Sequence, residues 1–251
     1  MGAILSEAVG AILAGGLGTR LRAAVSDRPK VLAVVRGRPF LAYLLDQLAS
    51  AGIKRVVLMT GHRGEQIKDQ FGDSYGPIEL DYSAESAPLG TAGALRFAYP
   101  TLFGPVAASG PETARTVLVM NGDSYCALDL AKFVATGNRA WGHAGLVLTR
   151  VADTARFGHV EIGIDGRVVR FIEKADAAGA GWINAGIYLV DRELVAEIPE
   201  GRAVSIEREM FPAWCRRQRL SGFRTDGDFI DIGTPESYLA AEEFFSRSAA
   251  A

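Results

Sequence analysis

The residues best suited to chemistry lie in a glycine-rich loop near the start of the chain, which cationic side chains follow. The loop residues that we expect to take part are Leu13, Ala14, Gly15, Gly16, Gly18, Thr19, Arg20 and Lys30. Glycine lets the backbone adopt positive φ and approach a ligand closely, and successive N–H groups in such a turn bind anions. Arg20 and Lys30 add positive charge suited to phosphate oxygens. The loop therefore predicts a nucleoside triphosphate site; the alternative is a tight strand-to-helix turn with exposed cations.

Two aspartates stand at the ends of apolar extended segments. Asp123 follows residues 116–120, and Asp231 lies in the segment 228–232, just before a predicted helix. Mg²⁺ in proteins is typically held by one or two carboxylates together with substrate phosphate oxygens. Asp123 and Asp231 are therefore the predicted Mg²⁺ ligands. Taken one at a time, Asp123 could instead form an Asx-turn and Asp231 could cap the last helix.

A third group, which begins at Glu85, has the chemistry of a base-binding site. The Glu85 carboxylate can accept two parallel donors, and guanine presents such a pair on its Watson–Crick edge. Pro88 and Leu89 offer apolar cover, and Gly90 and Gly93 let a flat ring approach the backbone on either side of Thr91. The group favours guanine, and the alternative is a solvated glutamate near a helix N-terminus.

Alternating strand and helix patterns must position these residues. The patterns predict strands over residues 9–14, 55–59, 78–82, 116–120, 144–150, 182–190, 219–225 and 228–232, and helices over 40–51, 64–71, 91–99, 130–137, 206–217 and 235–245. An Asp-Gly turn predicts a hairpin over 159–172, and residues 101–115 have the composition of a surface loop. No linker-like stretch divides the chain, so we expect one α/β domain over residues 1–251 with a mixed, mainly parallel central sheet. Ligands in such sheets bind beyond the carboxyl ends of the strands.

Composition excludes several other classes of protein. The chain has 251 residues, of which 49% are hydrophobic and 22% charged, and a net charge of −2 with acids and bases interspersed. This balance argues against a nucleic-acid surface. Cys126 and Cys215 stand alone and predict reduced thiols. Residues 1–9 lack the features of a signal peptide and no apolar run could span a membrane, so we expect a cytoplasmic protein.

The glycine loop is neither a P-loop nor a dinucleotide fingerprint. The P-loop spacing is absent, and Leu21 stands where the third glycine of Gly-x-Gly-x-x-Gly belongs. The strings LAGGLGTRL and PKV instead resemble the signature of the sugar-1-phosphate nucleotidyltransferases, the nucleotide-diphospho-sugar pyrophosphorylases, with Val31 in place of the usual second proline. The resemblance extends over nearly the whole chain, including FIDIG near its end. The string ESAPLGTAGA is similar to the guanylyltransferase branch, which activates mannose 1-phosphate and manno-heptose 1-phosphate.

This resemblance implies the fold of that family, a Rossmann-like three-layer sandwich, and roles for further residues. Glu173 and Lys174, which composition alone would make a solvated ion pair, match the family's Glu-Lys pair and are expected to bind the sugar phosphate. Asn184 and Gly186 lie in the string NAGIY, which resembles the sugar-binding segment, and Gly158 is expected near the same site. Mg²⁺ on the two aspartates is implied as the cofactor.

The expected reaction is nucleotidyl transfer from GTP to D-glycero-α-D-manno-heptose 1-phosphate, with release of pyrophosphate. Arg20 and the loop amides would hold the terminal phosphates, Lys30 would draw the two reacting phosphates together, and Asp123 would complete the catalytic set. The partners are then small-molecule substrates rather than nucleic acid or membrane, and the sequence leaves open whether the chain forms homo-oligomers.

The alternatives are a mannose-1-phosphate guanylyltransferase and another sugar-1-phosphate uridylyl- or thymidylyltransferase. A non-catalytic nucleotide-sugar-binding protein is disfavoured because Lys30, Asp123 and Asp231 are all present. The missing third glycine disfavours a dinucleotide-dependent oxidoreductase.

Overall fold

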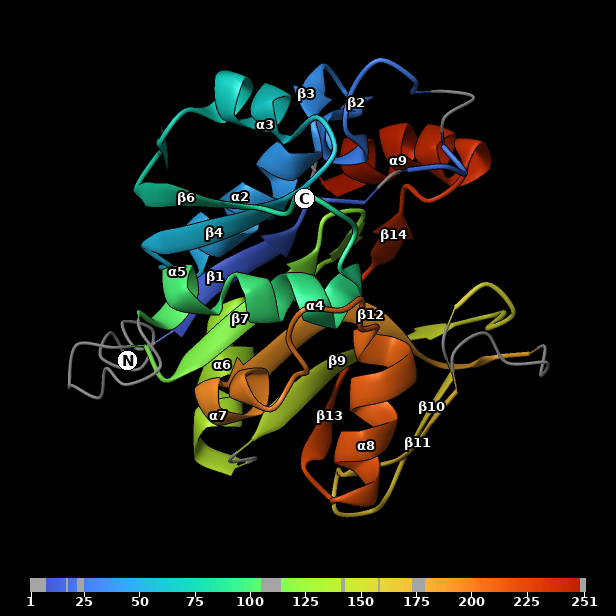
Figure 1. The fold of residues 1–251 in the computed structure, drawn as a ribbon. Coiled ribbons are helices and arrows are strands. Elements are labelled where there is room, and N and C mark those ends of the chain that lie inside the picture. The colour runs from blue at the N-terminus through green and yellow to red at the C-terminus, as the bar shows by residue number, and fades with distance from the viewer. Residues whose placement is uncertain are drawn as a thin grey trace.

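A central sheet, with ten strands among the described residues, runs through the molecule (Figure 1). The computed structural model describes residues 8–16, 18–21, 25–104, 114–140, 143–157, 159–172 and 179–248. The strands of this sheet are β1 (Ala8–Leu13), β4 (Arg55–Thr60), β5 (Ser74–Tyr75), β6 (Ile78–Ala84), β7 (Thr116–Asn121), β9 (Ala144–Val151), β10 (His159–Ile162), β11 (Val168–Ile172), β12 (Gly181–Asp191) and β13 (Leu220–Thr225). Two short pairs stand apart from it: β2 (Val34–Val35) with β3 (Arg38–Pro39), and β8 (Ser124–Cys126) with β14 (Phe229–Asp231).

The order of the strands joins a parallel half to a mixed half. Strands β7, β1, β4 and β6 lie side by side and are parallel. Strand β12 runs antiparallel to both β7 and β9, and β13 pairs with β9 in parallel. The hairpin β10–β11 has the predicted position and is antiparallel. The predicted fold class, an α/β sandwich around a mixed, mainly parallel sheet, is therefore confirmed.

Helices cover both faces of this sheet (Figure 1). They are η1 (Lys30–Leu32), α2 (Phe40–Ser50), α3 (Gly64–Phe71), α4 (Gly90–Phe97), α5 (Tyr99–Phe103), α6 (Leu130–Ala140), α7 (Arg192–Ala196), the π-helix η2 (Ile206–Met210), α8 (Phe211–Arg216) and α9 (Pro235–Ser248). The structure divides the helix predicted over 91–99 into α4 and α5, and it adds η1 and α7. The loop predicted over 101–115 begins inside α5, and its residues 105–113 lie outside the described residues.

The sheet separates two hydrophobic clusters because neighbouring residues of a strand point to opposite faces. On β7, Leu118 and Met120 belong to one cluster, whereas Val117 and Val119 belong to the other. The first cluster packs under α2, α6 and α9, and the second under α4, α5, α7 and α8. Each central strand is thus buried on both sides, which explains why these strands are continuous apolar runs in the sequence.

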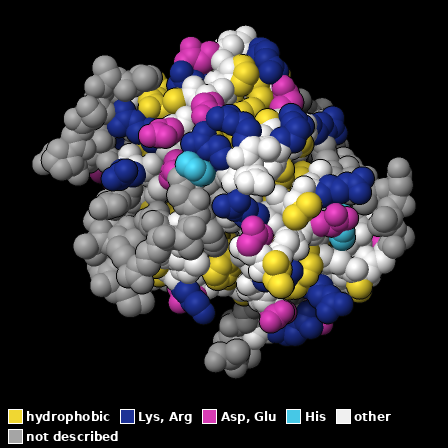
Figure 2. Space-filling model, turned by 90° about the horizontal axis from the view of Figure 1, so that it is seen from below, with side chains coloured by type: hydrophobic (Ala, Val, Ile, Leu, Met, Phe, Trp, Pro, Cys, Tyr) yellow, Lys and Arg dark blue, Asp and Glu magenta, His cyan; other side chains and the backbone are white. Residues whose placement is uncertain are grey.

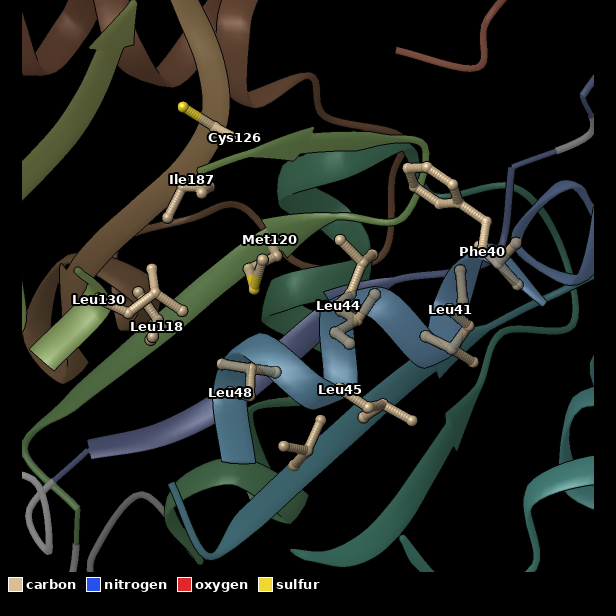
Figure 3. Packing of buried hydrophobic residues seen from close by; sticks show 14 of the residues in the cluster. Phe40, Leu41, Leu44, Leu45, Leu48, Leu118, Met120, Cys126, Leu130 and Ile187 are labelled. Atoms are coloured by element: carbon tan, nitrogen blue, oxygen red, sulfur yellow. The ribbon is translucent and has the colours of Figure 1, made fainter. Parts of the chain in front are cut away.

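Helix α2 shows how periodicity fixes a packed face. Its buried leucines are Leu41, Leu44, Leu45 and Leu48, and Figure 3 shows them beside Leu118 and Met120 of β7. The helix ends at Ser50, and Gly52 follows with a φ of 84°, as expected for a glycine after a helix. The structure therefore confirms this predicted helix and its end.

Charges of both signs alternate over the face of the molecule that Figure 2 shows. Two arginines that follow α8, Arg217 and Arg219, both pair with Glu197. Cys126 and Cys215 are free, and burial raises the pKa of their thiols to about 12 and about 11. None of the helices in the described ranges combines the length and the apolar character that crossing a membrane requires.

Candidate functional site

The carboxyl ends of β1, β4, β6 and β7 meet at one edge of the sheet. Backbone hydrogen bonds join these ends: Ala14 N donates to Met59 O at 2.8 Å, and Gly122 N donates to Leu13 O at 3.0 Å. The approach at Gly122 is so close that a Cβ there would lie 2.3 Å from Leu13 O. Glycine is therefore required at the end of β7, and it lets the segments after β1 and β7 form one wall.

A cavity of about 360 Å³ opens at this edge. Among its lining residues are the predicted Leu13, Ala14, Gly15, Gly16, Lys30, Glu85, Pro88, Gly90, Thr91 and Asp123. The remaining described lining residues, which the sequence did not single out, are Val31, Met59, Ala94, Asn121, Gly122 and Glu207. Residues from six separate segments thus face one space, and most of these segments follow strand ends, as the sequence predicts.

Lys30 and Asp123 form the charged centre of the cavity. Lys30 Nζ lies 2.7 Å from Asp123 Oδ2, and the exposed fractions of the two side chains are 11% and 42%. Lys30 begins the 3₁₀ turn η1, whose next two residues, Val31 and Leu32, are buried and anchor it. The ammonium group is therefore held in place by packing while the carboxylate stays accessible to a ligand.

Asp231 lies beside this pair because β8 and β14 are neighbours. Ile232 N donates to Asp123 O at 2.8 Å, which places the two aspartates on adjacent chain segments. A Cβ built on Gly233 would lie 2.6 Å from Asp231 Oδ2 and 3.7 Å from Lys30 Nζ. Both carboxylates are thus grouped around the Lys30 ammonium, although they are 108 positions apart in the chain.

This donor set fits a magnesium ion that also binds substrate. Within the described residues, no three or more histidine, cysteine or acidic side chains form a metal-binding group. Two carboxylates completed by phosphate oxygens are, however, a usual Mg²⁺ arrangement. Asp231 additionally pairs with Arg156, whose Nη2 lies 3.1 Å from Oδ1. Asp123 and Asp231 remain the predicted ligands, and phosphate oxygens and water would complete the coordination of the ion.

As local alternatives, the sequence offered an Asx-turn for Asp123 and a helix cap for Asp231. In the structure these two roles belong to other residues. Asp231 forms an Asx-turn, because its Oδ2 accepts a hydrogen bond from Gly233 N at 2.8 Å. Helix α9 is capped by Thr234, whose Oγ1 accepts from Ser237 N at 3.3 Å. The Asx-turn orients the Asp231 carboxylate, and Arg156 Nη2 donates to both of its oxygens, at 3.1 and 3.2 Å.

Glu85 lies between two glycines. A Cβ on Gly15 would be 3.1 Å from Glu85 Oε1, and a Cβ on Gly61 would be 3.2 Å from the same atom. Leu89 N donates to Oε2 at 3.2 Å, and burial raises the pKa of this carboxyl above its usual value. The glycine of the loop therefore also makes room for the carboxylate predicted to recognise the base.

The predicted sugar-binding residues of β12 make hydrogen bonds within the protein. Asn184 Nδ2 donates to Tyr188 Oη at 2.9 Å, and Asn184 Oδ1 accepts from Gly186 N at 2.8 Å. The Tyr188 hydroxyl is buried and also donates to Asn121 Oδ1 at 3.5 Å. Gly186 has a φ of 77° at a shift in the β12–β9 register. Asn184 and Gly186 are not among the lining residues of the cavity, so their sugar contacts stay a prediction.

The other predicted residues fall into two groups. Gly18 is half-buried, and Thr19 and Arg20 are exposed. None of the three is among the described lining residues of the cavity, so their phosphate contacts also stay predictions. Gly158, Glu173 and Lys174 lie outside the described residues.

Glu207 is a cavity residue that the sequence did not indicate. It lies on the π-helix η2, and its Oε2 accepts from Thr91 Oγ1 at 2.9 Å and from Ser205 Oγ at 3.1 Å. Thr91 and Glu207 are 116 positions apart, so no local pattern could have joined them. Asn121, by contrast, could have been found, because it begins the Asn-Gly-Asp string that contains Asp123.

Comparison with known proteins agrees with this fold. Residues 9–248 match the family described as "Nucleotidyl transferase", and the chain belongs to this family. It is 35% identical over 231 residues to a mannose-1-phosphate guanylyltransferase of Mycobacterium tuberculosis, and the match covers 91% of this chain and 62% of that protein. It is 34% identical over 232 residues to a D-glycero-α-D-manno-heptose 1-phosphate guanylyltransferase of Aneurinibacillus thermoaerophilus, with 92% and 96% covered.

A solved structure has the same arrangement of elements. HddC from Yersinia pseudotuberculosis superposes with a TM-score of 0.79 at 32% identity, covering 94% of this chain and 99% of that one. The same protein complexed with GMP-PN superposes with a TM-score of 0.76. The family predicted from the loop signature is thereby confirmed. The chain spans 62% of the length of the mycobacterial relative and nearly all of HddC.

Proposed function

We propose that this chain is a guanylyltransferase that joins GTP and a sugar 1-phosphate to give a GDP-sugar and pyrophosphate. The observation that carries the proposal is the grouping of the Lys30 ammonium, the Asp123 carboxylate and the Gly15–Gly16 backbone in one cavity at the strand ends. Two reacting anions repel each other, and positive groups such as the ammonium and the backbone N–H groups allow them to approach. Similarity to two named guanylyltransferases supports the choice of nucleotide.

The reaction requires positioning and charge neutralisation rather than a covalent intermediate. A phosphate oxygen of the sugar 1-phosphate attacks the α-phosphorus in line, and the bond to the oxygen that bridges the α- and β-phosphates breaks. Lys30 would lie between the α-phosphate and the sugar phosphate and reduce their repulsion. To do so its ammonium must exchange part of its contact with Asp123 for phosphate oxygens.

Asp123 and Asp231 would hold the divalent ion in this reaction. A bound Mg²⁺ neutralises the charge that develops on the phosphate oxygens. Asp123 supplies a carboxylate that is 42% exposed, and the Asx-turn orients that of Asp231. Arg156 beside Asp231 keeps a positive group close to this carboxylate before an ion arrives.

Glu85 is the residue that we propose selects guanine. Its carboxylate lies in the same cavity as the loop glycines, and ionised oxygens there can accept from the ring N–H and the exocyclic amine of guanine. Pro88 and Ala94 supply apolar surface in the same lining. Adenine and the pyrimidines lack that adjacent pair of donors, so they should bind less well.

For the sugar, we propose D-glycero-α-D-manno-heptose 1-phosphate. The proposal is supported by the similarity to the heptose-specific relative along 96% of its length and by the resemblance of the strings that begin at Glu85 and Phe229. Mannose 1-phosphate is the second candidate, since the mycobacterial relative is equally similar.

A pyrophosphate-release assay tests all parts of this proposal. GTP, ATP, UTP, CTP and dTTP are each paired with the 1-phosphates of the heptose, mannose and glucose, with Mg²⁺ or with EDTA. We expect the highest kcat/KM for GTP with the heptose 1-phosphate and no turnover in EDTA. Faster turnover with mannose 1-phosphate would reassign the sugar. Faster turnover with UTP or dTTP would reject the assignment of the base, and no turnover with any pair would reject the proposed function.

A further inference from the structure

Each of the two predicted ion ligands pairs with a basic side chain of the protein. Asp123 pairs with Lys30 at 2.7 Å, and Asp231 pairs with Arg156 at 3.1 Å. The two pairs are neighbours, because Ile232 N, next to Asp231, donates to Asp123 O at 2.8 Å. A divalent ion that binds both carboxylates therefore competes with two cations of the protein itself.

Lys30 and Arg156 differ in their freedom to move away from the carboxylates. The Lys30 side chain is 11% exposed and belongs to η1, which buried residues anchor. The Arg156 side chain is 49% exposed and lies in the loop between β9 and β10. A half-exposed arginine can change rotamer without unpacking the core, and partly exposed ion pairs are weak. Arg156 is therefore the cation that an entering ion would displace.

Arg156 contacts both oxygens of the Asp231 carboxylate. Its Nη2 donates to Oδ1 at 3.1 Å and to Oδ2 at 3.2 Å. Oδ2 also accepts from Gly233 N at 2.8 Å in the Asx-turn, so Oδ1 is the oxygen better placed to bind an ion. Two cations in contact with the same oxygen repel each other strongly. The ion and the arginine therefore compete for Oδ1.

The residue after Arg156 attaches this loop to β14. Phe157 packs edge-on against Phe229, with the ring centroids 5.5 Å apart, and Phe157 N donates to Thr154 O at 3.0 Å to close a turn. The guanidinium carbon of Arg156 lies 5.4 Å from the Phe157 ring centroid, within the range of a cation–π contact. The loop can therefore stay on β14 when the Arg156 side chain leaves Asp231, and the Phe157 ring remains available to the guanidinium.

We infer that Arg156 takes the place of the divalent ion at Asp231 and is displaced when the ion binds. The inference rests on the proposed function, which requires the ion. The arginine lowers the affinity of the two aspartates for a free divalent cation, because the ion must first break the pair of Arg156 with Asp231. Arg156 is thus a positioning residue that acts on the ion through Asp231.

The test measures binding of Mn²⁺ to the protein without substrates, by electron paramagnetic resonance. Mn²⁺ suits the same carboxylate and water ligands as Mg²⁺. We expect Arg156→Gln to bind Mn²⁺ about fivefold more tightly than the wild type, the upper end of what a partly exposed ion pair contributes. The matched control is Arg167→Gln. Arg167 also pairs with an aspartate, Asp165 at 3.7 Å, and its side chain is 51% exposed, but it lies at the turn of the β10–β11 hairpin. The control should bind Mn²⁺ as the wild type does.

A double-mutant cycle separates competition at Asp231 from a general effect of charge. Removing a positive charge near the ion strengthens Mn²⁺ binding in any background, whereas competition for Asp231 needs its carboxylate. In the Asp231→Asn background we therefore expect Arg156→Gln to change the Mn²⁺ affinity by less than about twofold. Loss of Mn²⁺ binding in both Asp231→Asn variants would place the ion at Asp231, and the comparison of Arg156→Gln with the wild type then decides.

Three outcomes would overturn this role of Arg156. Arg156→Gln could bind Mn²⁺ no more tightly than Arg167→Gln, or the gain in affinity could be the same in the Asp231→Asn background. If neither the wild type nor any variant binds Mn²⁺, the inference fails together with the predicted ion site. Failure of the proposed function shows separately, as a lack of turnover in the pyrophosphate-release assay, and leaves the comparison of Mn²⁺ affinities unchanged.

Discussion

Lys30 is the single residue on which the proposed reaction depends most. Its side chain is nearly buried, and its ammonium lies 2.7 Å from the Asp123 carboxylate. Lys30→Gln keeps a polar side chain, shorter by one atom, but removes the charge. We expect kcat to fall ~100- to 1,000-fold, the usual effect of losing one preorganised charge. Stability should fall by only ~1 kcal/mol because the Asp123 carboxylate can be hydrated.

Steady-state pyrophosphate release and thermal unfolding measure these two effects. The matched control is Lys68→Gln, because Lys68 also pairs with an aspartate, Asp73 at 3.5 Å, but on the open surface. The control should keep full activity. Turnover of Lys30→Gln close to that of the control would remove Lys30 from the catalytic set.

At the scale of elements, the contact between the ends of β1 and β7 forms the floor of the cavity. Gly122→Ala would place a methyl group 2.3 Å from Leu13 O and 2.7 Å from Val31 Cγ1, so the strand ends must separate. We expect the free energy of unfolding to fall by about 1–3 kcal/mol, as for other overpacked sites. Activity should fall as well, because Val31 adjoins Lys30 on η1.

Chemical denaturation gives the change in stability, and Gly16→Ala is its control. Among the residues that the structure describes, a Cβ at Gly16 meets no heavy atom within 4 Å, and the φ of Gly16 is not in the left-handed region. Gly16→Ala should therefore unfold at the same denaturant concentration as the wild type. Equal stability of Gly122→Ala and Gly16→Ala would show that the strand ends tolerate separation.

For the whole molecule, the single domain predicted from the sequence remains to be tested. The two hydrophobic clusters lie on opposite faces of the same strands. If one cluster lost its packing, one face of the shared strands would be exposed to water, and this would destabilise the other cluster as well. We therefore propose one cooperative unfolding transition. GTP with Mg²⁺ at about 100 times its Kd should raise the free energy of unfolding by about 2.7 kcal/mol and shift the entire transition upward.

Differential scanning calorimetry measures this transition with and without the nucleotide. The relevant control is ATP with Mg²⁺, which shares the phosphates but lacks the donor pair of guanine. It should raise the melting temperature less than GTP does. Two separate transitions, or a shift in only part of the unfolding signal, would contradict a single domain.

The sequence predicted correctly those helices and strands whose residue patterns lie within one continuous segment. The strands β1, β4 and β7 and the helices α2 and α3 have strong periodicity or continuous apolar runs, and their predicted positions agree within one or two residues. Short elements such as η1, β8 and α7 carry too few residues for a period to appear. The change from the π-helix η2 to α8 was missed for a different reason: residues Ile206 and Glu207 of η2 make hydrogen bonds with Thr91 of α4, which is distant in sequence.

The sequence by itself determined the family, the fold class and the ends of strands at which the cavity lies, because loop spacing and apolar runs are properties of neighbouring residues. Only the tertiary structure decided that Lys30 pairs with Asp123, that Glu85 lies between Gly15 and Gly61, and that Glu207 lines the cavity. These contacts join segments far apart in the chain, so they depend on how the strands are ordered and packed. The pattern of neighbouring residues in the sequence does not specify the distance between such segments. That distance is set only when the chain folds.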